Sequence, residues 1–331
     1  MNILGQKPSI KLFVSATFIL CLICGVYFAV LIKKNNITEA TTEFHLSLAN
    51  TPTPYPLPKK VYAPPSYLTT VLGQIFGNQD KVISPFEIIE NGQKESGDEH
   101  LDLYIQNGYL PVDSQWWQQE SHQVYEYVSR RLDTTTDEKA IVTFVPPETG
   151  DCALRGKTFH EQQPVILIFA NQDTSKEQVL AVLAHELGHV FIHQKYESLS
   201  DTALNEGMAT WAAGDYWKAW KGMDFNAGVR SYIVDKEYLP LFQNYDMSKA
   251  YDDVASCKHR AMLLTELASF IDYLIQSRGL EQLSALFNVQ QPELVNNQSV
   301  VYPPNFKGVY GLELNQLEDE WLKALLYDSS Q

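Results

Sequence analysis

The sequence feature that most constrains this fold is the pair His185 and His189, with Glu186 between them and Glu206 following 17 residues after His189. In an α-helix, residues four positions apart lie on one face, so both imidazoles can approach a single cation. Glu186 lies about 100° round the helix and flanks that cation without binding it. A catalytic zinc site keeps three protein ligands and leaves one position to water. We therefore expect one Zn²⁺ ion held by His185, His189 and Glu206.

The residues around this motif predict a buried helix over 174–194. Apolar side chains recur there with helical spacing, and Thr174-Ser175-Lys176-Glu177 has the pattern of a capping box. The alternative is a surface helix with two solvated histidines. Two histidines and a glutamate on the inner side of a buried helix need compensation, because an unpaired buried charge is costly. A bound metal is the simplest compensation, which favours the zinc interpretation.

Residues 12–32 predict a transmembrane anchor that follows a short tail, residues 1–11. They contain no charged residue over 21 positions, which corresponds to about 32 Å of helix, enough to cross a bilayer core. A cleaved signal peptide is the alternative. Its apolar region is usually shorter, about 7–15 residues, and ends in a small-residue cleavage site. The segment here ends in Ala29-Val30-Leu31-Ile32-Lys33-Lys34, which favours an uncleaved anchor.

The expected location is the cell membrane, single-pass, with the C-terminal domain outside the cytoplasm. Basic residues are split evenly across the span, so the positive-inside rule decides little. The preference rests on the short N-terminal tail and on the cysteines. The chain carries 40 acidic against 25 basic residues, and this balance argues against nucleic-acid binding.

A proline-rich linker is expected over residues 33–65, since alternate prolines favour an extended spacer. The domain that follows covers residues 66–331, with its core at about 141–326. Outside the apolar span the cysteines are Cys152 and Cys257. They form one disulfide if the compartment is oxidising, and two buried thiols otherwise.

Hydrophobic periodicity predicts an α+β fold, with a small N-terminal β-sheet followed by a mostly helical C-terminal half. Strands are expected at 140–145 and 164–170, and loops at 91–100 and 150–161. The expected helices are 67–76, 115–132, 174–194, 202–220, 256–279, 280–287 and 314–326.

HELGH at 185–189 and LNEGMATW at 204–211 resemble the gluzincin metallopeptidases, peptidase MA-like domains in which HExxH is completed by a downstream glutamate. ASFIDYLI at 268–275 and RGLEQL at 278–283 are similar to a helix that these domains place after the site. GVYGLEL at 308–314 with LEDEWL at 317–322 is similar to their C-terminal ending. The resemblance implies a gluzincin-like zincin domain and zinc-dependent hydrolysis of peptide bonds.

By this resemblance Glu186 is the general base that activates a zinc-bound water. Residues 165–169 would form the strand beside the substrate. Tyr251 or His259, with Tyr232 and Tyr245 as further options, would donate to the developing oxyanion. Asn205 would contact the substrate backbone, or alternatively cap a helix. His193, one helical turn beyond His189, is too far along the helix to complete the site and is expected to be solvated or part of the core.

The chain departs from thermolysin-like enzymes at Thr210, where they carry an aspartate that supports a zinc histidine. No clear aminopeptidase motif is present, and the expected enzyme is an endopeptidase acting on a peptide or protein. The alternatives are a non-catalytic zinc-binding module that docks or senses peptides, and a structural protein with a zinc-stabilised core. Glu186 favours the enzyme, because a binding site needs no general base. A structural site normally has four ligands, and only three are apparent.

Overall fold

The computed structural model describes residues 60–62, 89–136, 138–147, 155–160, 163–196, 201–245, 257–288, 293–295, 298–301 and 304–327. All of them belong to the compact unit Pro58–Gln331. The expected anchor (12–32), most of the expected linker and the expected helix at 67–76 lie outside the described residues. None of the described helices has the length and apolarity to cross a membrane.

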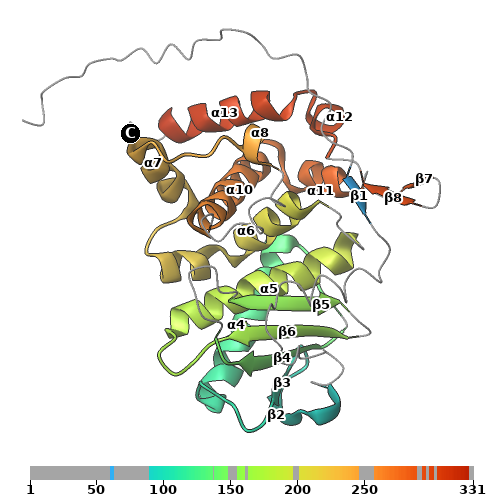
Figure 1. The fold of residues 1–331 in the computed structure, drawn as a ribbon, viewed down its shortest axis with the longest axis vertical. Helices are drawn as coiled ribbons and strands as arrows, with labels where there is room; N and C mark the ends of the chain where they lie inside the picture. The colour runs from blue at the N-terminus through green and yellow to red at the C-terminus, as the bar shows by residue number, and fades with distance from the viewer. Residues whose placement is uncertain are drawn as a thin grey trace, which may run out of the picture. The chain divides into compact units, whose positions relative to one another are not determined.

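A five-stranded mixed sheet organises the first half of this unit (Figure 1). Its order is β2-β3-β4-β6-β5, with β3, β4 and β6 parallel and the outer strands β2 and β5 antiparallel to their neighbours. The central strands β4 and β6 are buried along their whole length. The strand bounds are β2 Gln93–Gly97, β3 Leu101–Ile105, β4 Ala140–Val145, β5 Gly156–His160 and β6 Pro164–Phe169.

The expectation of loops at 91–100 and 150–161 is wrong, because β2 and β5 occupy these segments. Both are outer strands of the described sheet, and neither is fully buried. Such strands need no apolar alternation, since they are held by their hydrogen bonds to a central neighbour. Their sequences therefore lack the pattern that identifies a buried strand.

Two helices, α4 (Ser114–Leu132) and α5 (Lys176–Tyr196), cover one face of this sheet (Figure 1). Alternate residues of the central strands, such as Phe144 and Ile168, pack into one core with both helices. The opposite face carries a separate buried cluster of Ile141, Val145, Val165, Leu167 and Phe169. Helix α5 begins after Ser175, whose hydroxyl accepts a hydrogen bond from the Gln178 amide at 3.1 Å. The cap is therefore one residue later than the sequence pattern indicated.

The second half is mostly helical, as expected. The helices are α6 Thr202–Lys221, α7 Phe225–Asp235, α8 Leu241–Asn244, α10 Cys257–Arg278, α11 Leu280–Asn288, α12 Phe306–Tyr310 and α13 Leu314–Tyr327. A small antiparallel sheet of order β1-β8-β7, which the sequence did not indicate, interrupts them. Its strands are β1 Lys60–Tyr62, β7 Glu293–Val295 and β8 Gln298–Val301. Strand β1 thus lies inside the segment expected to be a linker.

Two buried carboxylates join the C-terminal helices. Glu318 on α13 accepts hydrogen bonds from the amides of Leu241 (2.6 Å) and Phe242 (2.9 Å) and from the Tyr238 hydroxyl. Glu266 on α10 accepts one bond from the Leu239 amide at 3.1 Å, and its Oε2 has no partner among the described residues. Burial raises the pKa of Glu266 to about 8, and the nearby Glu318 adds to this although the Leu239 amide opposes it.

Candidate metal centre

Helices α5 and α6 pack closely enough to bring distant residues to one point. A Cβ atom added at Gly188 would lie 2.8 Å from the Ala209 Cα, so only glycine lets the two backbones approach this closely. Helix α6 is fixed at its start by Asp201, whose carboxylate accepts from the Leu204 amide at 2.8 Å. It bends at Gly214, after the residues that concern this site.

The structure brings His185, His189 and Glu206 together. The two histidine Nε2 atoms lie 3.1 Å apart. The Glu206 carboxylate lies 3.4 Å from His185 Nε2 and 3.9 Å from His189 Nε2. Donor atoms bonded to one tetrahedral zinc at 2.0–2.1 Å are about 3.3 Å apart. Side-chain exposures of 14%, 11% and 21% for His185, His189 and Glu206 leave the group reachable by water.

The Nδ1 atoms of His185 and His189 form hydrogen bonds with residues of helix α6. Asn205 Oδ1 lies 3.1 Å from His189 Nδ1 and can only accept, which places the ring proton on Nδ1. The Thr210 hydroxyl donates to the Glu206 carbonyl at 2.8 Å and accepts from His185 Nδ1 at 3.3 Å. Asn205 therefore supports a histidine and does not cap the helix, a role that Asp201 takes. Thr210 contacts His185 from the position where thermolysin-like enzymes carry the aspartate that supports a zinc histidine.

These contacts test whether a metal fits. With both Nδ1 atoms protonated, His185 and His189 turn two Nε2 lone pairs toward each other across 3.1 Å, beside the Glu206 carboxylate. Three electron-pair donors in this arrangement repel one another unless a cation lies between them. Two imidazoles and a carboxylate are also the donor set of known catalytic zinc sites. The residues present therefore fit a single Zn²⁺ ion.

Glu186 is held beside this group by strand β5. The Thr158 hydroxyl lies 2.7 Å from Glu186 Oε2 and 3.2 Å from the Glu186 carbonyl oxygen. A Cβ atom at Gly156 would lie 2.8 Å from the Glu186 Cδ, so the carboxylate occupies space that only glycine leaves open. Burial raises the pKa of Glu186 to about 7, while His189 and the Thr158 hydroxyl partly oppose this.

Residues 165–169, which were expected to form the strand beside the substrate, are the interior strand β6 of the described sheet, so they cannot pair with a substrate along an edge. Strand β6 is paired on both sides, in parallel with β4 and antiparallel with β5, so it has no edge to offer. Strand β5 forms an edge of the described sheet. Its Thr158 reaches Glu186, a contact the sequence gave no reason to expect because 28 residues separate them.

The contacts of the remaining candidates that the structure describes lie elsewhere in the fold. His259 is exposed on α10, and the Tyr245 hydroxyl donates to Asp201 Oδ1 at 3.1 Å. His193 stacks on His160 with ring centroids 4.0 Å apart. Tyr251 and Cys152 lie outside the described residues, as does the side chain of Cys257, so the oxyanion donor and the disulfide stay predictions.

The family described as IrrE N-terminal-like domain, Peptidase_M78, has a model that matches residues 137–213. The match runs from β4 through the first part of α6 and includes His185, Glu186, His189 and Glu206. It supports a zinc-metallopeptidase-like domain in this part of the chain, in a family that includes non-catalytic regulators. No curated protein matches the chain.

Proposed function

We propose that this chain is a zinc-dependent peptidase of the gluzincin type, with Glu186 as its general base. The observation that carries the proposal is the convergence of His185, His189 and Glu206 next to a buried Glu186. A site that only binds metal has no use for a carboxylate held beside the ligands. The match to Peptidase_M78 over the same residues supports the assignment.

Each protein group has a defined task in this proposal. Zinc, when bound, supplies Lewis acidity to a water molecule and to the scissile carbonyl. The Glu186 carboxylate takes the proton from the attacking water and gives it to the leaving amine. Thr158 holds Glu186 in place through its 2.7 Å hydrogen bond. Asn205 and Thr210 keep the two imidazoles oriented, as outer hydrogen-bond partners of metal ligands usually do.

The substrate in this proposal is an extended peptide that pairs with β5, an edge strand of the described sheet. An edge strand offers backbone N–H and C=O groups to a further strand, and such pairing fixes a peptide without reading its sequence. Thr158 lies on β5 and touches Glu186, so a peptide on this edge has its backbone close to the general base. Internal cleavage follows if the chain passes through the site, which makes the enzyme an endopeptidase.

The proposed location is the cell membrane. The uncharged segment 12–32 would anchor the chain, and the C-terminal domain would face outward on a linker. Peptides or proteins outside the cytoplasm would then be the substrates. Nucleic acid is not among the proposed partners, given 40 acidic against 25 basic residues.

The second candidate function is a zinc-binding module that docks or senses peptides without cleaving them. It is favoured by one observation, that the matching family includes non-catalytic regulators. Both candidates use the same three ligands, and they differ in whether Glu186 transfers a proton.

The discriminating experiment compares the purified full-length chain with Glu186→Gln, using Glu177→Gln as the control. Glu177 is an exposed carboxylate at the start of the same helix. Zinc content and cleavage of a quenched-fluorescence peptide library are measured for all three. We expect zinc to be retained in all three and cleavage to fall by roughly 10²–10⁴-fold in Glu186→Gln alone. Equal cleavage by Glu186→Gln and wild type would remove Glu186 from the reaction. Zinc-loaded wild type without cleavage would favour the docking module.

A further inference from the structure

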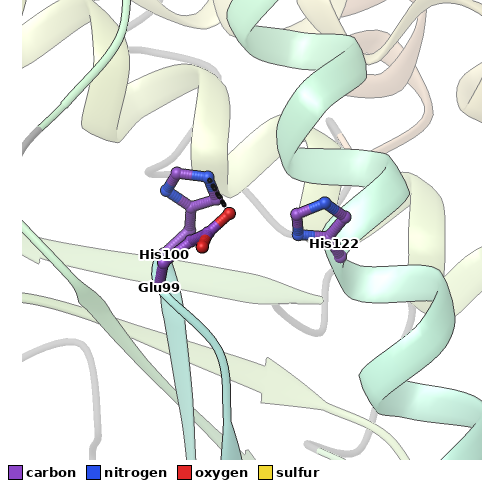
Figure 2. Close-up of side chains that lie close together, drawn as sticks. All are labelled: Glu99, His100 and His122. Atoms are coloured by element: carbon purple, nitrogen blue, oxygen red, sulfur yellow. Dashed lines mark ion pairs between the residues drawn. The ribbon is translucent and has the colours of Figure 1, made fainter.

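A second group of metal-binding side chains lies where the β2–β3 turn meets helix α4. Glu99 and His100 are in the turn and His122 is on the helix (Figure 2). Each offers one donor atom, and these atoms all lie within 4.8 Å of one another. His100 Nε2 is 3.6 Å from Glu99 Oε1, close to the spacing of about 3.3 Å expected for two donors on one zinc ion.

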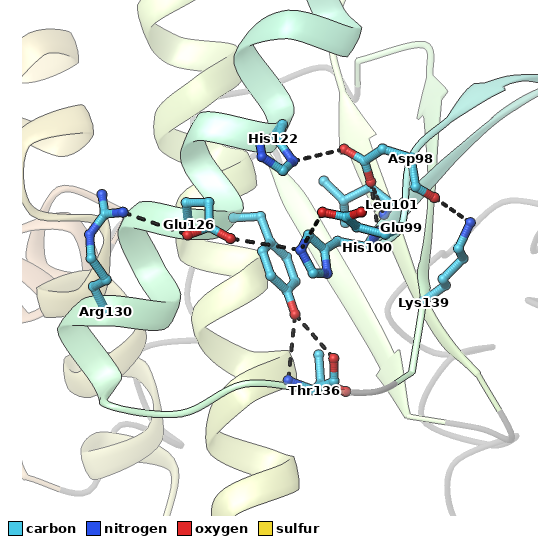
Figure 3. Close-up of polar contacts among 10 residues, drawn as sticks. Asp98, Glu99, His100, Leu101, His122, Glu126, Arg130, Thr136 and Lys139 are labelled. Atoms are coloured by element: carbon cyan, nitrogen blue, oxygen red, sulfur yellow. Dashed lines mark hydrogen bonds and ion pairs between the residues drawn. The ribbon is translucent and has the colours of Figure 1, made fainter.

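The turn that carries two of these residues is shaped by Asp98. Its Oδ1 accepts from the backbone amides of His100 at 2.7 Å and Leu101 at 2.8 Å. Its Oδ2 lies 3.1 Å from His122 Nδ1, so the same carboxylate links the turn to helix α4 (Figure 3). Burial opposes the charge of Asp98, but these hydrogen bonds outweigh it and lower its pKa.

The His100 ring is held in a fixed plane. It stacks on Tyr125 with centroids 3.9 Å apart and 7° between the planes. Tyr125 is itself buried, and its hydroxyl donates to the Thr136 carbonyl at 3.2 Å. His100 is thus a preorganised ligand, because little rotational freedom remains to be lost on binding.

A third carboxylate lies near His100 Nε2. Glu126 lies one helical turn after His122, and its Oε1 is 3.7 Å from His100 Nε2 (Figure 3). Arg130 pairs with the other oxygen of Glu126 at 3.6 Å, on the outer side of the helix. Lys139 donates to the Asp98 carbonyl. Three carboxylates, from Asp98, Glu99 and Glu126, therefore surround two imidazoles.

We propose that Glu99, His100 and His122 form a second divalent-cation site that ties the β2–β3 turn to helix α4, with Glu126 as a neighbouring carboxylate. Imidazole and carboxylate donors together suit zinc and similar first-row ions better than calcium or magnesium, which prefer oxygen alone. The His100 and His122 rings now lie at 19° with centroids 5.7 Å apart. Coordination by both requires His122 to turn out of this stack, and its 41% exposed side chain has room to do so.

This site is distinct from the HExxH centre in its residues and its elements. It lies on the turn before β3 and on α4, whereas His185, His189 and Glu206 lie on α5 and α6. Its existence does not depend on peptidase activity. Its consequence is structural, because an ion bound only by the folded state raises stability by RT ln(1 + [ion]/Kd).

The test titrates ZnCl₂ into the metal-stripped full-length chain and counts bound ions by calorimetry with a competing chelator. Wild type is compared with His122→Gln and Glu99→Gln. Glu95→Gln is the control, because Glu95 is an exposed carboxylate on the same hairpin. We expect wild type and Glu95→Gln to bind two ions, and the two site variants to bind the second ion at least tenfold more weakly. Circular dichroism confirms that the variants are folded.

A second readout separates this site from the HExxH centre. Saturating zinc should raise the melting temperature of wild type more than that of His122→Gln, whether or not either chain cleaves peptides. A single ion per wild-type chain that His122→Gln still binds, or a second ion bound equally well by His122→Gln and wild type, would overturn the proposal. Failure at this site leaves zinc retention and the effect of Glu186→Gln at the HExxH centre unaltered.

Discussion

Thr210→Val should weaken zinc binding about 10–100-fold while leaving the fold intact, as loss of an outer partner of a metal ligand usually does. Thr210 is completely buried, and valine matches its volume with a methyl group in place of the hydroxyl. In the zinc-bound state His185 must keep Nε2 on the metal, so its Nδ1–H would face that methyl group. A buried donor without an acceptor costs about 1–3 kcal/mol. A 10–100-fold change in the dissociation constant corresponds to about 1.4–2.7 kcal/mol, the same range.

The matched control is Thr265→Val on helix α10. Thr265 is also buried, and its hydroxyl donates to the carbonyl four residues earlier, Ala261, at 3.1 Å. Thr210 makes the equivalent bond to Glu206 at 2.8 Å. Both variants therefore lose one intrahelical bond, and only Thr210→Val removes a contact with a histidine.

The assay is competition with a zinc chelator of known affinity, in a His122→Gln background that isolates the HExxH centre. Thermal unfolding of the metal-stripped proteins reports stability. We expect similar melting temperatures for the two threonine variants and weaker zinc binding for Thr210→Val alone. Zinc affinity of Thr210→Val equal to that of Thr265→Val would refute the supporting role of Thr210.

Three further predictions concern catalysis, helix packing and pH. Thr158→Val should lower kcat about tenfold or more with zinc retained. Thr158→Ser should restore kcat, because the 2.7 Å hydrogen bond to Glu186 needs only a hydroxyl group. Loss of zinc from Thr158→Val would contradict a positioning role for Thr158. Gly188→Ala should destabilise the chain by roughly 1–2 kcal/mol in denaturant unfolding. The reason is that overpacking against Ala209 costs more than the helix-propensity gain of about 1 kcal/mol. An unchanged unfolding midpoint would mean that helices α5 and α6 can move apart without a cost in stability. Burial raises the pKa of Glu266 from 4.5 to about 8. The protonated group therefore contributes stability below pH about 4.5, which is lost as pH rises through about 8, with a slope of at most about 1.4 kcal/mol per pH unit. Glu266→Gln should flatten the fall of the melting temperature between pH 5 and 8.5, and identical profiles would exclude Glu266 as its source.

The long helices could be predicted from the sequence because each buries a face with helical spacing. Helix α5 was expected at 174–194 and runs from Lys176 to Tyr196, and α6 was expected at 202–220 and runs from Thr202 to Lys221. Buried strands β4 and β6 were also found, since continuous apolar runs mark them. In each case the signal is local, and a short window of sequence contains it.

The outer strands could not be found in this way. Strand β5 reads Gly-Lys-Thr-Phe-His and is only partly buried, so its identity depends on its partner β6. Strand β2 is polar throughout, and in the described sheet it pairs only with β3. The extent of a sheet at its edges depends on non-local hydrogen bonds, which composition does not encode.

The three proposed ligands were identified in the sequence because their spacing follows from helix geometry and a known motif. Their supporting residues were not, although Asn205 and Thr210 lie one position before and four after Glu206. Which of them meets His189 and which meets His185 depends on how α6 crosses α5. Thr158 was missed for the same reason, since its contact with Glu186 joins a strand to a helix. Contacts between elements require the packing to be known.

The most direct test of the central claim is the zinc dissociation constant of Glu206→Gln, measured on the full-length chain in the His122→Gln background. If His185, His189 and Glu206 hold one ion, replacing the carboxylate with an amide should weaken binding by more than about 100-fold, the upper end of the effect of an outer partner. Glu177→Gln in the same background should bind zinc as the parent does. Unchanged affinity in Glu206→Gln would contradict the three-ligand centre on which the proposed peptidase depends.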